Sequence, residues 1–366
     1  MDKKIPCLDL RGQHQQIKKE VFEAFEKVYE QTAFSGGSFV EAFEKSYAGF
    51  CGTNYAVGVN NGTTALHLAM LALGIGNGDE VIIPANTFIA TAWGVSYTGA
   101  IPVFVDCEPN TWEIDASKIE AAITPKTRAV IGVHLYGQPF DIRAVEAICK
   151  KHKLHLIEDA AQAQGATYHG VPVGGFGAMA CFSFYPGKNL GACGEAGGIT
   201  TNNEDYYKHL QSLRNHGSVV RYYHDEIGYN MRMGGLEAAS LSVKLKYLPA
   251  WNGRRKDIAK KYHAALKNPK IKMQVQPEGH GSVFHLFVVT TEDRDKLTNY
   301  LNEKNIFPGL HYPVPCHLQK AYAGLGYKNG DFPQSEYLAA HCLSLPMYAE
   351  LTDEEVDYVI NTLNSY

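Results

Sequence analysis

The sequence predicts an α/β fold, in which a mostly parallel sheet is covered by helices on both faces and is followed by a smaller C-terminal α+β domain. Short apolar, β-branched runs alternate with helical patterns as far as about residue 250. The runs are apolar at consecutive positions, as in strands buried on both faces. From about residue 251 this alternation stops, and long helices flank a single strand-like run. We therefore expect two domains, 1–250 and 251–366.

The first domain begins with helical patterns. Residues 13–31 carry apolar side chains at helical spacing, and Ser38 opens a second amphipathic stretch with Glu41 in capping-box spacing. Strand-like runs follow at 56–59, 80–84, 102–106, 129–133 and 154–157. Helical patterns lie at 65–73, after the run at 80–84 as far as residue 92, and at 141–151. Ligands of such sheets bind at the carboxyl ends of the strands, so the residues after these runs are the first candidates for a site.

The second domain shows a different order of elements. We expect helices at 254–265, 293–304 and 353–363, a strand at 283–289 and an irregular proline-rich segment at 306–316.

Composition sets limits on function. The 366 residues are 45% apolar and 20% charged, with a formal net charge of −4, which argues against nucleic acid or an anionic membrane as the main partner. No apolar run reaches the roughly 18 residues of a membrane span. The start, Met1–Pro6, lacks the apolar core of a signal peptide. The eight scattered cysteines form no CxxC pair and indicate reduced thiols, so a cytoplasmic location is expected.

Lys188 is the most informative residue. It lies in the turn-rich stretch Ser183–Gly191, and Asp159 follows the apolar run at 154–157. An amine and a carboxylate at strand-to-loop junctions match the needs of pyridoxal 5′-phosphate (PLP). The amine attaches to the cofactor's aldehyde, and the carboxylate keeps the pyridine nitrogen protonated so that the ring withdraws electrons. Taken singly, a loop lysine or a strand-end acid is more often a solvated surface group.

The stretch Asn61–Leu66 lies between a strand and a helix. Gly62 permits a tight turn, and the helix N-terminus offers free backbone N–H groups to a phosphate, with Thr63 and Thr64 as possible hydroxyl donors. A simple helix N-cap is the alternative reading of this motif.

Four motifs in order carry a family resemblance. They are Glu158–Gln162, Ser183–Gly191, Arg214–Gly217 and Gly228–Met233. Together they resemble the sugar aminotransferases of the DegT/DnrJ/EryC1/StrS family, PLP enzymes of fold type I with a seven-stranded sheet. The resemblance extends from Leu8 to Pro315 and so covers nearly the whole chain.

The resemblance implies roles around the cofactor ring. Lys188 would bind the cofactor covalently and carry the proton that moves during transfer. Asp159 would pair with the ring nitrogen, Gln162 would approach the 3′-oxygen and Phe88 would stack on the ring face. Lysine at 188, where some relatives carry histidine, favours transamination over removal of a sugar hydroxyl.

The resemblance also implies a shared phosphate site. Gly62, Thr63 and Ser183 would bind the phosphate within one subunit, and Asn230 would reach the phosphate of the neighbouring subunit. A homodimer would then be the functional unit.

The substrate implied is a nucleotide-linked keto sugar, with L-glutamate as the amino donor. Tyr185 before the lysine and Asn189 after it resemble enzymes that aminate C3 of a dTDP-3-keto-6-deoxyhexose. The alternative is the same chemistry at C2 or C4. Many C3-aminating relatives read Asn-Ser-Arg-Leu-Asp-Glu where this chain reads Asn230-Met-Arg-Met-Gly-Gly235. Because of this difference, the resemblance does not fix which sugar is the substrate. The product would serve amino-sugar synthesis, such as that of lipopolysaccharide O-antigen.

Substrate contacts are expected from hydroxyls and imidazoles, namely Tyr185, His311, Tyr312 and His317. Arg214 and Arg232 are candidates for the glutamate carboxylate, with a structural role as the alternative. A zinc site at His311, Cys316 and His317 would lack a fourth ligand at metal spacing.

Two other classes fit the pattern less well. An NAD-dependent sugar dehydrogenase would need Gly-x-Gly-x-x-Gly after the first strand, and this chain lacks it. A PLP-binding regulator without catalysis would normally add a DNA-binding segment, and this chain shows no basic arm.

Overall fold

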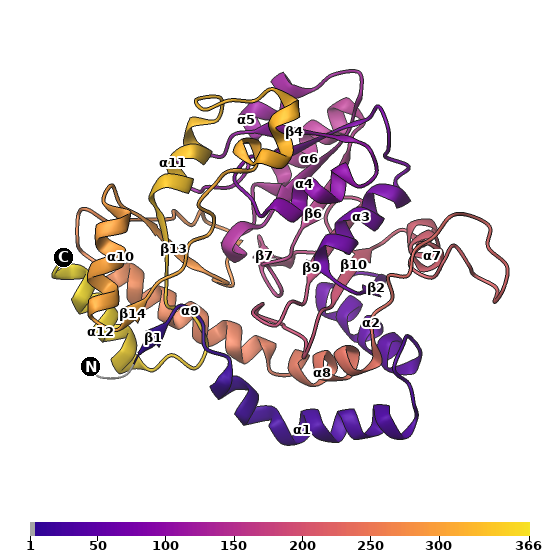
Figure 1. Ribbon diagram of the computed structural model, residues 1–366, viewed down its shortest axis with the longest axis horizontal. Coiled ribbons are helices and arrows are strands. Elements are labelled where there is room, and N and C mark those ends of the chain that lie inside the picture. Colours follow the sequence, from indigo (N-terminus) through magenta and orange to yellow (C-terminus); the bar gives the residue numbers. More distant parts are fainter. Residues whose placement is uncertain (1–3) are drawn as a thin grey trace.

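A seven-stranded sheet organises the computed structural model, which describes residues 4–366 (Figure 1). Residues 1–3 of the N-terminus interpreted above lie outside the described residues. The strand order is β2 (Tyr55–Val59), β10 (Gly197–Thr201), β9 (Met179–Ser183), β6 (His155–Asp159), β5 (Thr127–Val133), β3 (Glu80–Pro84) and β4 (Ile101–Val105). β10 pairs antiparallel with both neighbours, and the other ladders are parallel. The predicted α/β class with a mostly parallel sheet is confirmed.

Each face of the sheet packs on its own set of helices. One core joins α3 (Gly62–Ala72), α4 (Ile89–Ser96) and α7 (Glu204–Leu213), and the opposite core joins α2 (Ser38–Cys51), α6 (Ile142–His152) and α8 (Gly235–Leu245). Ile82 faces one core while its neighbours Val81 and Ile83 face the other, and all three are fully buried. Each such side chain contributes roughly 1.5–3 kcal/mol, which explains the unbroken apolar runs in the sequence.

The C-terminal residues form a third core. It is built on α9 (Leu248–Ala265) and α12 (Asp353–Asn364), and on a sheet of β11 (Lys272–Met273), β13 (Phe287–Thr290) and β15 (Cys342–Leu345). β1 (Ile5–Pro6) pairs in parallel with β14 (Ile306–Phe307), so Ile5 packs in this core. α9 runs through residue 250, and the division there stays a prediction.

The remaining elements connect or cover these three cores. They are α1 (Arg11–Glu30), α5 (Ala116–Ile119), α10 (Arg294–Glu303), α11 (Pro333–His341), and the small sheet of β12 (His280–Gly281), β7 (Thr167–Tyr168) and β8 (Val171–Pro172). α1 lies beside α8 along the lower edge of the molecule in Figure 1. Within the described part of the chain, none of the helices is both long and apolar enough to cross a membrane.

Two local expectations were wrong. Ser38 is the first residue of α2 and Gly37 is the cap, with no side-chain cap bond, so the capping box expected from Ser38 does not form. The predicted strand at 283–289 begins only at Phe287. Its first part leaves the extended conformation at Phe284, whose φ is +45°, and bonds instead to the loop that holds Gly137.

Candidate active site

A cavity of about 600 Å³ lies at the carboxyl ends of the sheet strands. It brings together ten of the residues predicted from sequence: Gly62, Thr63, Phe88, Asp159, Gln162, Ser183, Tyr185, Lys188, His311 and Tyr312. β6 supplies Asp159 and β9 supplies Ser183, while α3 begins at Gly62. Parallel strands end at one edge of a sheet, which is why positions so distant in sequence meet here.

Asp159 is the buried acid of the cavity, with 5% of its surface exposed. Its Oδ2 accepts a hydrogen bond from Thr91 Oγ1 at 2.7 Å, and its Oδ1 accepts from Ala161 N at 3.2 Å. Burial raises the pKa of this carboxyl, and the two donors together with the positive charge of Lys188 oppose that rise. A cation bound beside the carboxylate would complete its pairing.

Lys188 provides the amine. Burial lowers the pKa of its ammonium to about 8, although the negative charge of Asp159 acts in the opposite direction. A lysine with this pKa releases its proton near neutral pH and becomes a nucleophile. The tight loop that carries it is closed by a bond from Lys188 N to Tyr185 O at 2.8 Å and by a bond from Ala192 N to Phe184 O at 2.8 Å.

The N-terminus of α3 forms one end of the cavity. Asn61 caps the helix, and its side chain accepts a hydrogen bond from Thr64 N at 2.8 Å. This cap bond leaves the N–H groups of Gly62 and Thr63, which have no partner within the helix, for a ligand. A Cβ on Gly62 would stand 2.7 Å from Ser183 Cβ, so glycine is what allows the two segments to approach. Backbone N–H groups at the helix N-terminus, the helix dipole and the Ser183 hydroxyl are together suited to hold a phosphate.

Gln162 and Tyr312 shape the middle of the cavity. Gln162 Oε1 accepts from Tyr136 N at 2.6 Å, and its Nε2 donates to the Tyr312 hydroxyl at 3.0 Å. The Tyr312 ring lies against Phe88, with centroids 5.3 Å apart. Phe88, half exposed, therefore offers an aromatic face beside Asp159 and Lys188.

His311 is fixed at the opposite wall. Its Nδ1 lies 2.8 Å from Ser344 Oγ, and its carbonyl accepts from the Tyr136 hydroxyl at 2.6 Å. Burial and the charge of Lys188 lower the pKa of His311 to about 4, so its imidazole is neutral at physiological pH.

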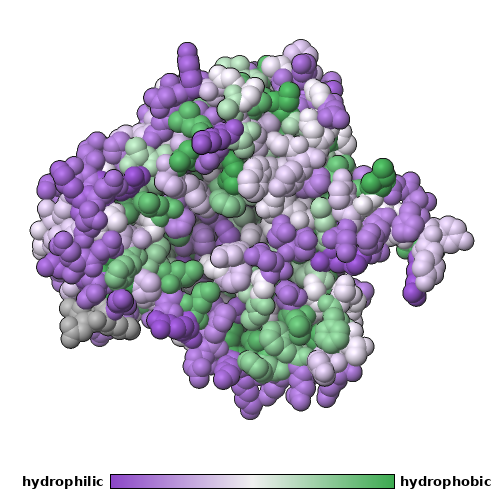
Figure 2. Space-filling view, viewed as in Figure 1, coloured by the Kyte–Doolittle hydropathy of each residue, from purple (hydrophilic) through white to green (hydrophobic). Residues whose placement is uncertain are grey.

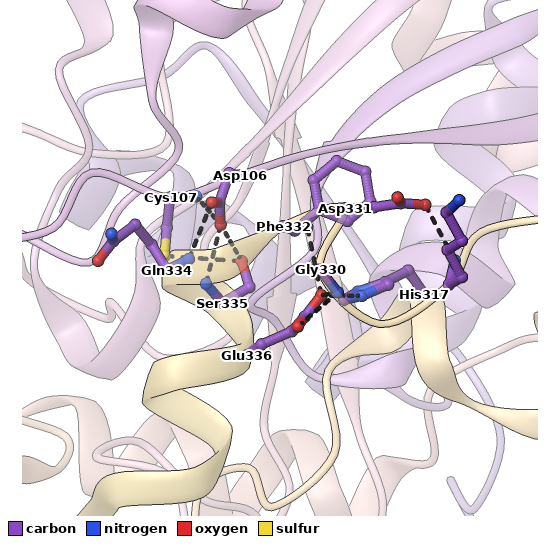
Figure 3. Close-up of polar contacts among 10 residues, drawn as sticks. Asp106, Cys107, His317, Gly330, Asp331, Phe332, Gln334, Ser335 and Glu336 are labelled. Atoms are coloured by element: carbon purple, nitrogen blue, oxygen red, sulfur yellow. Dashed lines mark hydrogen bonds and ion pairs between the residues drawn. The ribbon is translucent and has the colours of Figure 1, made fainter.

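Three predicted residues are not brought to the cavity. Thr64 is buried behind the α3 cap, and Asn230 is exposed on the loop after α7. His317 is buried, and its Nε2 lies 3.0 Å from Glu336 Oε1. Figure 3 shows His317 directed toward Glu336, whose carboxylate also accepts from Gly330 N.

The two candidate arginines also lie elsewhere. Arg214 is paired with Glu44 and donates to Gly58 O, so its role is structural. Arg232 bonds to Asn215 Oδ1 at 2.9 Å.

Sequence reasoning missed several residues of the site. Thr91 contacts Asp159, and Cys7, Glu195 and His285 line the cavity. The spacing of Thr87 and Thr91, one helical turn apart, was the only available signal among these.

These residues fit PLP. The cavity offers an amine of lowered pKa, a buried carboxylate without a basic partner within hydrogen-bonding distance among residues 4–366, an aromatic face and a helix N-terminus cleared by Gly62. Each would suit one part of the cofactor: aldehyde, ring nitrogen, ring face and phosphate.

Comparison with known proteins agrees with this site. The chain is 44% identical over 362 residues to a dTDP-3-amino-3,6-dideoxy-α-D-galactopyranose transaminase of Aneurinibacillus thermoaerophilus, covering 99% of both chains. It is 42% identical over 365 residues to a "pleiotropic regulatory protein" of Geobacillus stearothermophilus, covering 99% of this chain and 98% of the other.

Among solved structures, DesV of S. venezuelae in complex with a ketimine intermediate superposes with a TM-score of 0.97 at 42% identity, covering 99% of this chain and 98% of that one. The model of the DegT/DnrJ/EryC1/StrS aminotransferase family matches residues 15–364. With the PLP-compatible cavity, these matches show that the chain belongs to the DegT/DnrJ/EryC1/StrS family of PLP-dependent aminotransferases.

Proposed function

We propose that this protein transfers an amino group from L-glutamate to C3 of a dTDP-linked 3-keto-6-deoxyhexose, as a step in amino-sugar biosynthesis. The observation that carries the proposal is the meeting of Lys188, Asp159 and a phosphate cradle in one cavity. The transaminase name of the Aneurinibacillus relative, which specifies a 3-amino dTDP sugar, supports the position and the nucleotide.

The residues divide the work. PLP, when bound, supplies the electron sink that makes transfer of an amino group possible. Lys188, with a pKa of about 8, would take and return the proton that shifts between two carbons lying two bonds apart, on either side of the transferred nitrogen. Asp159 would hold a proton on the ring nitrogen by its negative charge, and Gln162, fixed by Tyr136 N, would orient the ring edge.

The sugar is proposed to lie between Tyr185 and the wall formed by His311 and Tyr312. Tyr185 is 54% exposed at the cavity, so its hydroxyl is free to meet a large polar substrate. The neutral imidazole of His311 can hydrogen-bond sugar hydroxyls without attracting the diphosphate into the wrong end of the cavity.

A homodimer is proposed as the active unit. Asn230 lies on the loop after α7, which extends away from the body of the molecule at the right of Figure 1. That loop exposes a set of large apolar side chains, Val219, Val220, Tyr222, Tyr223 and Ile227. Figure 2 shows hydrophobic residues gathered toward the bottom of the molecule. Phe22 and Tyr29 of α1 are also exposed. Apolar surface of this extent is typical of a surface that another chain covers.

The setting of the reaction is also a proposal. The free thiols of all eight cysteines and the sugar-nucleotide chemistry favour the cytoplasm. An O-antigen or other surface glycan is the proposed destination of the amino sugar.

A second candidate function is PLP-dependent regulation without turnover, which the name of the Geobacillus relative suggests. Incubation with PLP and glutamate separates the two. Stoichiometric or greater release of 2-oxoglutarate in the presence of a keto sugar supports the enzyme, and its absence supports the regulator.

The substrate itself is tested with a panel. PLP-loaded protein is incubated with glutamate and dTDP- or UDP-linked 3-keto and 4-keto sugars, and the products are identified by mass and NMR. Amination at C3 of the dTDP sugar supports the proposal. Products aminated only at C4 would overturn the proposed position while leaving the cofactor site in place.

A further inference from the structure

A chain of two threonine hydroxyls ends on the catalytic carboxylate. Thr91 Oγ1 donates to Asp159 Oδ2 at 2.7 Å, and Thr87 Oγ1 lies 2.8 Å from Thr91 Oγ1. Both threonines are buried, with 1% of Thr91 and 3% of Thr87 exposed. Buried hydroxyls that bond a charged acceptor form stronger hydrogen bonds than those between neutral groups.

The donor direction of the hydrogen bonds from Thr87 to Thr91 to Asp159 follows from the number of hydrogens available. A hydroxyl carries a single hydrogen, and that of Thr91 is given to Asp159. Thr87 must therefore donate to Thr91 while Asp159 is ionised. The two hydroxyl dipoles then both point their positive ends toward the carboxylate, and each polarises the next.

The backbone holds both hydroxyls in place. Thr87 and Thr91 flank the start of α4, whose first residue is Ile89, and Thr91 N bonds to Phe88 O at 3.1 Å. The Thr87 carbonyl accepts from Cys316 Sγ at 3.3 Å, which ties it to the proline-rich segment. Phe88, the residue offering its ring to the cavity, stands between the two threonines in sequence.

Two of the acceptor positions of Asp159 are filled, Oδ2 by Thr91 and Oδ1 by Ala161 N. An ionised carboxylate has about four such positions, so the donors restrict its rotation and leave the remaining positions for a ring nitrogen. The other ionisable groups around it are Lys188, His134, Cys181 and Tyr312.

We propose that Thr91 is a positioning residue, whose hydroxyl orients Asp159 and keeps it ionised for the pyridinium nitrogen of PLP, with Thr87 as its polarising donor. This inference rests on the PLP dependence of the family and not on the proposed sugar, so it stands or fails independently of the substrate.

The test compares Thr91→Val, which keeps the shape and removes the hydroxyl, with Thr91→Ser, which keeps the hydroxyl. Apoprotein is titrated with PLP to give a dissociation constant, and the visible band of the loaded protein is followed against pH. We expect Thr91→Val to weaken PLP binding about ten- to hundredfold, because an ion's hydrogen bond is lost. Thr91→Ser should stay within about threefold of wild type.

The direction with pH is also fixed. The Thr91 bond favours the ionised carboxylate, so its loss raises the pKa of Asp159. The acid limb of kcat and the pH midpoint of the visible band should therefore move to higher pH in Thr91→Val. Since Asp159 acts on the cofactor rather than on glutamate binding, kcat should fall while KM for glutamate changes little.

Thr362→Val is the matched control. Thr362 is also a buried helical threonine, and its hydroxyl bonds to Tyr358 O at 2.7 Å, but it lies in α12, outside the cavity. We expect Thr362→Val to lose about as much stability as Thr91→Val without changing PLP affinity or the pH midpoint of the visible band. That result would show that the effects of Thr91→Val on the cofactor do not come from a loss of stability.

Thr87→Val keeps the bond from Thr91 to Asp159 and removes only its polarising donor. We expect the same direction of change with a smaller size, about threefold, and this variant carries the test if Thr91→Val does not fold. The proposal is overturned if Thr91→Val retains wild-type PLP affinity and band midpoint, if Thr91→Ser behaves like Thr91→Val, or if Thr362→Val shifts the band as much.

Discussion

Asp159 and Lys188 line the same cavity, yet in the described structure they form no ion pair with each other. The carboxylate is held by Thr91 and Ala161, and the amine stands in a loop closed by its own backbone. The acid is buried and the amine is partly buried, and the charge of each only weakly lowers the cost of burying the charge of the other.

Replacing either residue by alanine is expected to remove most of the activity. Asp159→Ala would remove the partner of the cofactor's ring nitrogen, and loss of one partner of a buried ion pair costs roughly 3–5 kcal/mol, which is about two to four powers of ten in rate. Lys188→Ala would remove the amine that attaches the cofactor and carries the proton. Single-turnover rates of Lys188→Ala and Asp159→Ala, compared with wild type at saturating PLP, test this. An Asp159→Ala rate within tenfold of wild type would remove Asp159 from the catalytic role.

The amine of Lys188 should destabilise the cofactor-free protein. Its pKa falls from 10.5 to about 8 on folding, so between these pH values the unfolded chain binds more protons and stability rises with pH. Below pH 8 the full penalty of about 3 kcal/mol applies. Urea unfolding of apoprotein at pH 7 should show Lys188→Met more stable than wild type, with the difference shrinking toward pH 10.5. An equal difference at both pH values contradicts this assignment.

Gly62→Ala should weaken PLP binding. The added Cβ would lie 2.7 Å from Ser183 Cβ and force the two sides of the phosphate cradle apart. Overpacking of this kind costs about 1–3 kcal/mol, or about ten- to hundredfold in the dissociation constant. Gly253→Ala in α9 is the matched control, because nothing lies within 4 Å of its Cβ. Titration of both apoproteins with PLP tests this prediction. Equal PLP affinities of the two variants would show that the added Cβ at position 62 does not crowd Ser183.

The homodimer makes a prediction about mixed subunits. If Asn230 completes the neighbour's phosphate site, Lys188→Ala and Asn230→Ala homodimers are each impaired, but a hybrid of the two contains one complete site. Unfolding and refolding the two variants together should therefore recover activity above the sum of the separate preparations. A mixture that shows no gain, with hybrid formation confirmed by differently sized tags, would place Asn230 in its own subunit's site.

His317 should prove structural. Its imidazole is buried against Glu336 at 3.0 Å, outside the cavity. His317→Ala is expected to reduce the free energy of unfolding by about 1–3 kcal/mol and to leave KM for the sugar unchanged. Tyr185→Phe, by contrast, should raise KM with little loss of stability, since Tyr185 is exposed at the cavity. Denaturant midpoints and steady-state kinetics of the two variants provide the comparison.

Local sequence was sufficient for the residues that sit at strand ends. Asp159 follows an apolar run that is buried on both faces, and that burial fixes its place at the edge of the sheet. The strand that ends at Ser183, β9, was not among the predicted strands. Lys188 and Gly62 lie in turns whose glycines and proline are readable directly. The cofactor chemistry could be argued from Asp159, Lys188 and Gly62 because their geometry is set by neighbours in the chain.

The tertiary structure alone decided the partners of those residues. Thr91 reaches Asp159 across 68 positions, and His285 reaches the cavity because its segment bonds to the Tyr136–Gly137 turn instead of continuing a strand. His317, close to His311 in sequence, is turned away by its pairing with Glu336. Periodicity encodes which side of an element is buried, but which distant side chain meets it depends on how the elements pack, and that is a property of the whole chain.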